Sequence, residues 1–264
     1  MCDAGQHALI VGDRRYPSPH PVANHSYARS VNSGLAALDA TWLVQMNADV
    51  FVEPHTFDHL LGVLRHHPTG AVAAPLALDP TGAPQAMGAP YARHYRRLDR
   101  AARLNRLQGE GPTGALPAYV TVSWVAGYLQ AMSRHTWHQV GGFDESFRFF
   151  NEDLDFCLRA RQAGFHCLLV DSPVLHLGGS SPPTDPAFHA EGRRGGWLLA
   201  RRHHGRARRL AHHAFLWAEA VAGSWLHPSR PQRAGHRLVL EMLRSGAWDE
   251  SPFGPTLDDR SGGG

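Results

Sequence analysis

Apolar and polar positions along the first third of the chain form segments of two kinds. Short apolar runs at 7–13, 42–46 and 70–78 predict buried strands, whereas residues 26–38 and 55–68 place apolar side chains at helical spacing. Strand, helix, strand, helix and strand in this order indicate an α/β sheet with substantial parallel pairing.

The middle of the chain is less regular. Residues 79–118 combine turn sequences with a basic stretch at 91–106, and we predict that this region is loop-rich. Residues 119–133 are typical of a strand that is interrupted at Gly127. A short helix follows, and the glycine pair 141–142 ends it because glycine tolerates the left-handed cap.

A further helix is predicted to begin near Glu152 and to stop at Gly164, and residues 166–181 supply one or two closing strands. Beyond about residue 186, Arg, His, Trp and Leu at helical spacing predict two or three helices and a disordered tail. The resulting division is a core at 1–185 and a helical C-terminal appendage at 186–264.

Charge and cysteine content argue against several classes of protein. The formal net charge of +3 is too small to imply a nucleic-acid partner, and all 26 Lys and Arg residues are Arg. The three cysteines show no C-x-x-C spacing, which argues against a disulfide framework and against a cysteine zinc site. Their number and spacing fit a reducing cytoplasm.

The N-terminus lacks the charged and apolar pattern of a secretory signal. The longest mostly apolar stretch, at 214–226, contains Glu219 and is too short to span a bilayer. We therefore expect a cytoplasmic protein that is soluble, or at most peripheral at the inner face of the membrane.

Two polar side chains follow predicted strands. Asp49 comes after the strand at 42–46, at the strand end where open α/β sheets bind ligands, and its carboxylate suits a divalent cation that bridges to a phosphate. Taken alone, an N-x-D sequence after a strand is more commonly a plain turn. His176 ends another predicted strand and is either a structural residue or a neutral imidazole ligand.

Three carboxylates, Glu152, Asp153 and Asp155, crowd the start of the helix that ends at Gly164. Acidic side chains in a first turn complement the helix dipole, which is one sufficient explanation. A catalytic carboxylate is the other. Because successive helix positions differ by about 100°, only one of the three can point squarely at a given substrate atom.

The order of these motifs resembles that of the inverting family-two glycosyltransferases, and most closely their bacterial rhamnosyltransferase-like branch. The resemblance covers roughly residues 8–181 and is carried by "NHSYARSVNSGL", "NADV", "SWVAG", "GGFDESFRFFNEDLDFCLRARQAGF" and "VLHLGGSS". It implies a GT-A-like, Rossmann-related mixed sheet flanked by helices. The implied activity is transfer of a sugar, with rhamnose as the first candidate, during cell-surface polysaccharide biosynthesis.

The resemblance also assigns the donor side of the site. Asp49 matches the last acidic residue of the family's D-x-D metal motif, and Asn47 stands at the first position of that motif. His176 matches a histidine that helps to hold the metal and the diphosphate. The implied cofactor is Mg²⁺ or Mn²⁺, and the implied partners are a nucleotide-diphosphate sugar donor and a glycan or lipid-linked acceptor.

On the acceptor side, Asp153 matches the catalytic base, which takes a proton from the acceptor hydroxyl as that oxygen attacks the anomeric carbon. Glu152 and Asp155 are expected to orient the site or to bind acceptor. Trp124 and Gly127 fall where the family lines its donor and acceptor pocket.

The chain departs from the family at its N-terminus. Family members begin with a strand, a helix and a second strand that ends in a D-x-S turn, whereas the match here starts at about the third strand. Asp13 is too close to the helix at 26–38 to supply that turn. We therefore interpret the fold as N-terminally truncated, through a misassigned start or a degenerate copy.

Other functions remain open at this stage. One is a catalytically degenerate GT-A remnant that binds a glycan or a protein partner. A second is a glycoside hydrolase with paired carboxylates, which would need neither metal nor nucleotide sugar. A third is a nucleic-acid or membrane-surface binder that acts through the Arg-rich segment 193–213, although its arginines interleave with apolar residues as on an ordinary helix face.

Overall fold

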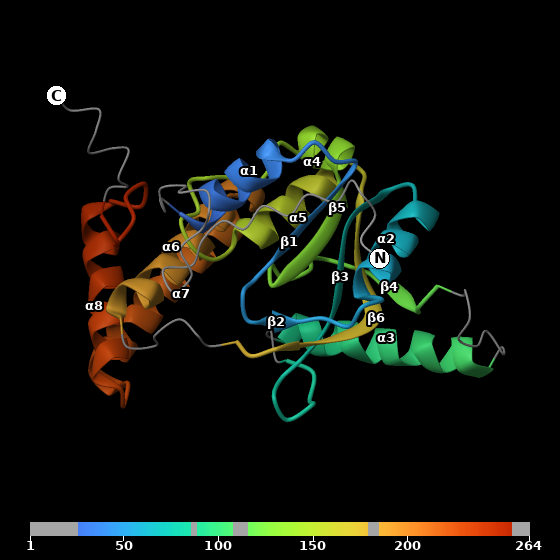
Figure 1. Ribbon diagram of the computed structural model, residues 1–264. Coiled ribbons are helices and arrows are strands. Elements are labelled where there is room, and N and C mark those ends of the chain that lie inside the picture. Colours follow the sequence, from blue (N-terminus) through green and yellow to red (C-terminus); the bar gives the residue numbers. More distant parts are fainter. Residues whose placement is uncertain (1–25, 86–88, 108–115, 179–184, 255–264) are drawn as a thin grey trace.

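The computed structural model describes residues 26–85, 89–107, 116–178 and 185–254 (Figure 1). A mixed sheet lies at its centre, with helices on both faces and a group of helices from the C-terminal part at one side (Figure 1). The strand predicted at 7–13 and the tail predicted to be disordered lie outside the described residues.

The main path of the sheet has the order β1-β5-β3-β6-β2. These strands are β1 (Trp42–Met46), β5 (Leu129–Ser133), β3 (Gly70–Leu78), β6 (His166–His176) and β2 (Val50–Phe51). A sixth strand, β4 (Tyr119–Val122), pairs with the first half of β6, and β2 pairs with its end.

The sheet is mixed, as predicted, and its parallel pairing is confined to one pair of the described strands. Among the described strands only β3 and β6 pair in parallel, and the other four pairings are antiparallel. The predicted alternation of strands and helices located β1 and β3 correctly. However, β5 lies between them and runs in the opposite direction, so these two strands are not neighbours.

Each face of the sheet buries its own apolar core. One core receives side chains from α1 (Tyr27–Ala37), α4 (Arg134–Val140) and α5 (Glu152–Gln162), and the other receives them from α2 (Thr56–His66). Strand β6 serves both cores because successive side chains on a strand point to opposite faces. Cys167 and Leu169 enter the first core, and Leu168 and Val170 enter the second.

Most predicted elements are confirmed, and their ends follow the expected chemistry. Ser26 caps α1 by accepting a 3.0 Å hydrogen bond from the Arg29 amide. Helix α4 ends at Gly141, whose φ of 89° is the left-handed conformation that glycine adopts readily. Residues 166–176 form one closing strand.

The loop-rich assignment of 79–118 is wrong for part of that range. Residues Ala89–Leu107 form helix α3. Its buried positions, His94, Leu98 and Ala102, recur every four residues, which is helical spacing. The many arginines between them hide this narrow buried stripe in the sequence.

Three helices follow the sheet in the part of the chain that the structure describes: α6 (Pro186–His203), α7 (Arg206–Leu226) and α8 (Arg230–Ser245). They pack on one another around an apolar cluster that includes Leu216, Val239 and Trp248. In Figure 1, α8 lies farthest from the sheet and α6 lies nearer to it. None of the described helices is both long and apolar enough to cross a membrane. The domain division at residue 185 stays a prediction.

Candidate active site

Asp49 and His176 are brought together by the pairing of two strand ends. Asp49 immediately precedes β2, whose Val50 pairs with His176 at the end of β6. The Leu177 amide also donates a 3.0 Å hydrogen bond to the Asp49 carbonyl oxygen. As a result, the Nε2 atom of His176 lies 3.4 Å from Oδ1 of Asp49.

The ring of His176 is oriented by Gln85, a residue that sequence reasoning missed. Nε2 of Gln85 donates a 2.7 Å hydrogen bond to the His176 carbonyl oxygen, which fixes the orientation of the amide. Oε1 of Gln85 then lies 2.7 Å from Nδ1 of His176, so Nδ1 carries the proton. The imidazole also stacks on Tyr128, with ring centroids 5.2 Å apart.

This arrangement suits a cation. Burial lowers the pKa of His176, and the Asp49 carboxylate opposes that shift, so the neutral ring turns the lone pair of Nε2 toward a carboxylate oxygen. Two acceptor atoms that face each other in this way favour a positive ion between them, and imidazole and carboxylate are common ligands of divalent ions. Within the described residues, no group of three or more His, Cys, Asp and Glu side chains could hold a metal.

Tyr27 joins this strand end to the next part of the site. Its hydroxyl lies 2.7 Å from Oε1 of Gln45 and 3.1 Å from Oδ1 of Asn47. It also lies 3.0 Å from the Gly127 carbonyl oxygen, which accepts a 2.7 Å hydrogen bond from Nε2 of Gln45. Sequence reasoning missed Tyr27 and Gln45 as site residues, because Tyr27 was interpreted only as one apolar position of a helix.

Carboxylates from both parts of the site act on the hydroxyl of Tyr27. Burial raises its pKa well above the usual range, and the carboxylates of Glu152, Asp153 and Asp49 raise it further. The phenol therefore stays protonated, and its single O–H group donates to one of the acceptor oxygens around it at a time.

Asp153 is held by backbone amides. Oδ2 accepts a 2.7 Å hydrogen bond from the Gly127 amide, and Oδ1 accepts one of 2.7 Å from Leu154. A side chain at Gly127 would place its Cβ 3.2 Å from the Cβ of Asp153, so glycine permits this close approach. Trp124, three residues earlier, is partly buried against both cores of the sheet.

Two of the three carboxyl groups at the start of α5, those of Glu152 and Asp153, have raised pKa values. Burial raises the pKa of Asp153, and the two backbone amides oppose this shift. Burial and, to a smaller extent, the charge of Asp153 raise the pKa of Glu152 to about 8. Oε2 of Glu152 is buried without a hydrogen-bond partner among the described residues. Burial thus makes each of these carboxylates, once ionised, a stronger base than usual, and Glu152 keeps its proton at neutral pH.

Asp155 points away from Glu152 and Asp153, and its expected part in orienting the site or binding acceptor stays a prediction. Its side chain is 1% exposed, and its oxygens lie 2.7 Å from Nε of Arg159 and 2.8 Å from Nε2 of His203. The physical reason is helix geometry, because a residue two positions after Asp153 points about 200° away from it. Asp155 therefore ties α5 to α6.

The loop before Asp153 is strained and is supported by α6. Phe150 and Asn151 both adopt left-handed backbone conformations, with φ of 67° and 70°. Helix α6 approaches them at Gly195, where an added Cβ would lie 2.5 Å from Nδ2 of Asn151. Sequence reasoning missed this contact because it separated α6 from the core.

A buried ion pair on α6 fixes the same loop. Glu191 and Arg194 lie 2.8 Å apart and are almost fully buried. Nη2 of Arg194 donates a 2.8 Å hydrogen bond to the Ser146 carbonyl oxygen, and the Arg148 amide donates one of 3.3 Å to Oε1 of Glu191. The position of Asp153 thus depends on residues about 40 positions later in the chain.

Comparison with known proteins agrees with the motifs. The family description "Glycosyltransferase like family 2" matches residues 12–200, which reaches into α6. The N-acetylglucosaminyl-diphospho-decaprenol L-rhamnosyltransferases of two Mycobacterium tuberculosis strains, CDC 1551 / Oshkosh and ATCC 25618 / H37Rv, are 32% identical to the chain over 201 residues. This match spans 67% of the chain and 64% of the length of these relatives.

Two solved structures are more distant. GalNAc-T7 with UDP, GalNAc and Mn²⁺ has 13% identity and a TM-score of 0.46, over 86% of this chain and 45% of that one. A mannosyltransferase from Pyrobaculum calidifontis in complex with GDP-Man and Mn²⁺ has 16% identity and a TM-score of 0.45, over 84% and 66%. With the family match over most of its length and the rhamnosyltransferase relatives, the chain belongs to family 2 of the glycosyltransferases.

Proposed function

We propose that this protein transfers a sugar from a nucleotide-diphosphate donor to a hydroxyl group of a lipid-linked glycan, with inversion at the anomeric carbon. L-Rhamnose is the first candidate sugar because the relatives are named as L-rhamnosyltransferases. Their name also gives a polyprenyl-diphosphate-linked N-acetylglucosamine as acceptor, and we extend that class of acceptor to this chain.

The observation that carries the proposal is the continuous set of contacts from Asp153 to Asn47. Asp153 accepts from the Gly127 amide, the Gly127 carbonyl oxygen contacts Tyr27, and Tyr27 contacts Asn47. Asp49, two residues after Asn47, lies beside His176. These contacts support a proposal in which a proton acceptor and a diphosphate-binding edge share one framework.

In this mechanism Asp153 acts as the general base. The acceptor oxygen attacks the anomeric carbon from the face opposite the diphosphate, its proton passes to the Asp153 carboxylate, and the bond from that carbon to the diphosphate oxygen breaks with its electron pair. A carboxylate has about four lone-pair positions, so the two backbone hydrogen bonds leave room for this proton. Positioned base catalysis is typically worth ~10²–10⁴-fold.

The chain's other residues hold the donor. Asp49 and His176 would bind Mg²⁺ or Mn²⁺, which would supply Lewis-acid stabilisation of the leaving diphosphate. Gln85 keeps the His176 ring in the tautomer that presents Nε2. Tyr27 keeps Asn47 and the Gly127 carbonyl in place, and the α6 contacts hold the strained loop in front of Asp153.

The test is release of nucleoside diphosphate from a panel of nucleotide sugars, one of which carries L-rhamnose. The purified protein is assayed with and without N-acetylglucosaminyl-diphospho-polyprenol, and with Mn²⁺, Mg²⁺ or a chelator. We expect acceptor-dependent release that the chelator abolishes and that Asp153→Asn lowers. A protein that binds the acceptor but turns over no donor would instead support the degenerate, glycan-binding alternative.

A further inference from the structure

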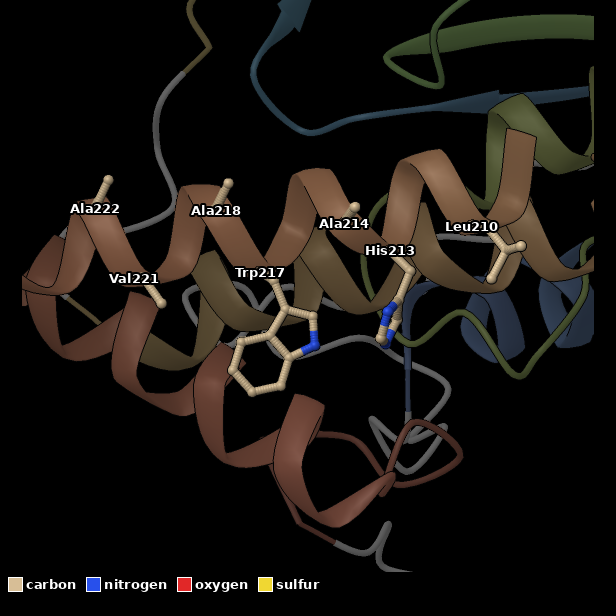
Figure 2. A pocket seen from close by; sticks show the side chains of 7 residues that line it. All are labelled: Leu210, His213, Ala214, Trp217, Ala218, Val221 and Ala222. Carbon is tan, nitrogen blue, oxygen red and sulfur yellow. The ribbon is translucent and has the colours of Figure 1, made fainter. Parts of the chain in front are cut away.

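Helix α7 exposes an apolar surface along its length. Figure 2 shows Leu210, His213, Trp217 and Val221 projecting to one side of the helix, with Ala214, Ala218 and Ala222 in the neighbouring row. These positions follow the three- and four-residue spacing of one helix face. The face continues into Trp225 and Leu226, which are 79% and 80% exposed, and Phe215 is exposed nearby.

Trp225 and Leu226 are the most exposed large apolar side chains in the described part of the chain. Apolar patches on soluble proteins mark sites that contact proteins or lipids. We define the α7 face as Leu210, Ala214, Phe215, Val221, Trp225 and Leu226. The buried side chains of α7 stand at other positions, namely Leu216, Ala220 and Ser224.

The charges on α7 identify the chemistry of its partner. Glu219 is the only acidic residue of α7, and it forms an ion pair with Arg193 of α6. All other charged side chains of the helix are arginines in its first turn, at 206, 208 and 209. Cations at a helix N-terminus oppose the helix dipole, so helix stability does not account for them.

Arg230, just beyond the other end of α7, is exposed as well. Arginines therefore stand at both ends of the α7 face. A second copy of the chain packed on this face, in either direction, would bring like charges together, because the described part of α7 offers no exposed acidic side chain to pair with them. An anionic bilayer satisfies both features, since headgroups pair with Arg while Trp and Leu enter the interface.

We propose that the α7 face lies in the interface of a bilayer that contains anionic lipids. Arg206 and Arg208 contact the phosphate groups at one end of the helix, and Trp225 and Leu226 insert at the other end. The surface holds the protein where a lipid-linked acceptor would be presented, but the binding itself does not depend on the glycosyl transfer proposed above.

Vesicle flotation tests this proposal without donor or acceptor. The full chain is mixed with vesicles of phosphatidylcholine alone or of phosphatidylcholine with phosphatidylglycerol, at low and high salt. We expect binding to the anionic vesicles that weakens with salt, and a partition coefficient at least ~10-fold lower for Arg206→Gln/Arg208→Gln. The matched control, Arg96→Gln/Arg100→Gln, removes two exposed arginines from α3 and should bind like the wild type.

Trp225→Ala/Leu226→Ala should lower the partition coefficient at least ~10-fold relative to the wild type, because it removes apolar side chains that would enter the interface. Both residues are exposed, so the fold is retained, and circular dichroism checks this. Equal binding to neutral and anionic vesicles, or no binding, would overturn the proposal. So would a concentration-dependent dimer in sedimentation that the Trp225→Ala/Leu226→Ala variant abolishes.

Discussion

Asp49 and Asp153 are both aspartates at the candidate site, but their surroundings prepare them for different tasks. Asp49 stands at a strand end beside His176, and the ring of that histidine is oriented by another side chain, Gln85. Asp153 stands at a helix start and is held by two backbone amides. The strand-end pair turns lone pairs toward each other, which favours a cation. The helix-start carboxylate is buried and more basic, which favours a proton.

The strand-end pair, Asp49 and His176, and the helix-start carboxylates also differ in the contacts that hold them in place. Strand pairing between β2 and β6 fixes the strand-end pair locally. The helix-start carboxylates instead follow two residues in left-handed conformations, and α6 packs against that loop from far along the chain. Substitutions at the strand-end pair should therefore alter ligand binding, whereas substitutions around the helix-start carboxylates should alter either proton transfer or stability.

The largest expected effect is that of Asp153→Asn. The amide keeps the size of the side chain but removes the proton acceptor, so turnover should fall by at least ~10²-fold while donor binding stays nearly unchanged. Steady-state kinetics and calorimetry with the nucleoside diphosphate measure the two quantities. If Asp153→Asn keeps most of the activity and Glu152→Gln abolishes it, the base has been placed one residue too late.

Asp155→Asn should act on stability and not on proton transfer. Its carboxylate is buried between Arg159 and His203. The amide removes the charge and keeps only one acceptor oxygen, so its NH2 group meets a donor of one of the two partners. We expect the free energy of unfolding to fall by about 2 kcal/mol in urea titrations, with turnover per folded molecule retained.

Asp99→Asn is the matched control, since Asp99 and Arg103 form an exposed pair at the same four-residue spacing. Such a pair contributes only about 0.3–0.5 kcal/mol. A large loss of turnover in folded Asp155→Asn would return this residue to the acceptor site.

These two aspartates show what the sequence could and could not predict. Helix periodicity was sufficient to predict that Asp153 and Asp155 point in different directions, and the resemblance then selected Asp153. The partner of Asp155 could not be predicted, because His203 lies 48 positions later, in a helix that the sequence assigns to the C-terminal appendage. Contacts between distant segments leave no periodic signal.

The same limit explains the errors in the fold. The spacing of apolar residues located β1, β3 and α5, but it carries no information on strand order, so the insertion of β5 between β1 and β3 was missed. Tyr27 and Gln45 looked like ordinary positions of a helix and a strand. Their side chains became part of the site only when α1 and β1 met near Gly127.

Gln85→Leu probes the strand-end pair and should have a smaller effect. The leucine side chain has no acceptor to hold the proton on Nδ1 of His176. The ring is then free to turn its Nε2 lone pair away from Asp49. Loss of such an orienting residue typically lowers metal affinity ~10–100-fold. Calorimetry should show weaker Mn²⁺-dependent binding of the nucleoside diphosphate, with metal-free binding unchanged.

Gln162→Leu is the control for this change, because it removes another Gln–His contact, with His203, outside the site. It should leave Mn²⁺-dependent binding as in the wild type. Equal nucleotide affinity with and without a divalent ion in the wild type would show that Asp49 and His176 hold no metal.

The smallest expected effect, counted per pH unit, is the contribution of Glu152 to the pH dependence of stability. Its pKa is raised from 4.5 to about 8 by burial, so between these values the folded protein keeps a proton that the unfolded chain releases. Unfolding therefore releases a proton, and this contribution to the free energy of unfolding is lost as pH rises through that window. Glu152→Gln removes it, so the stability of the variant relative to the wild type should rise by at most about 1.4 kcal/mol per pH unit.

Urea titrations of both proteins at pH 6, 7 and 8 measure the difference, and contributions from groups that both share cancel. Glu145→Gln is the control with the opposite sign, since Arg29 and Asn32 lower the pKa of Glu145 against the effect of its partial burial. The contribution of Glu145 to the free energy of unfolding is lost only as pH falls below the usual carboxyl range. The difference in this free energy between Glu145→Gln and the wild type should therefore stay constant from pH 6 to 8. A flat difference for Glu152→Gln as well would mean that Glu152 is ionised in the folded protein. The basic character inferred for the helix start would then rest on Asp153 alone.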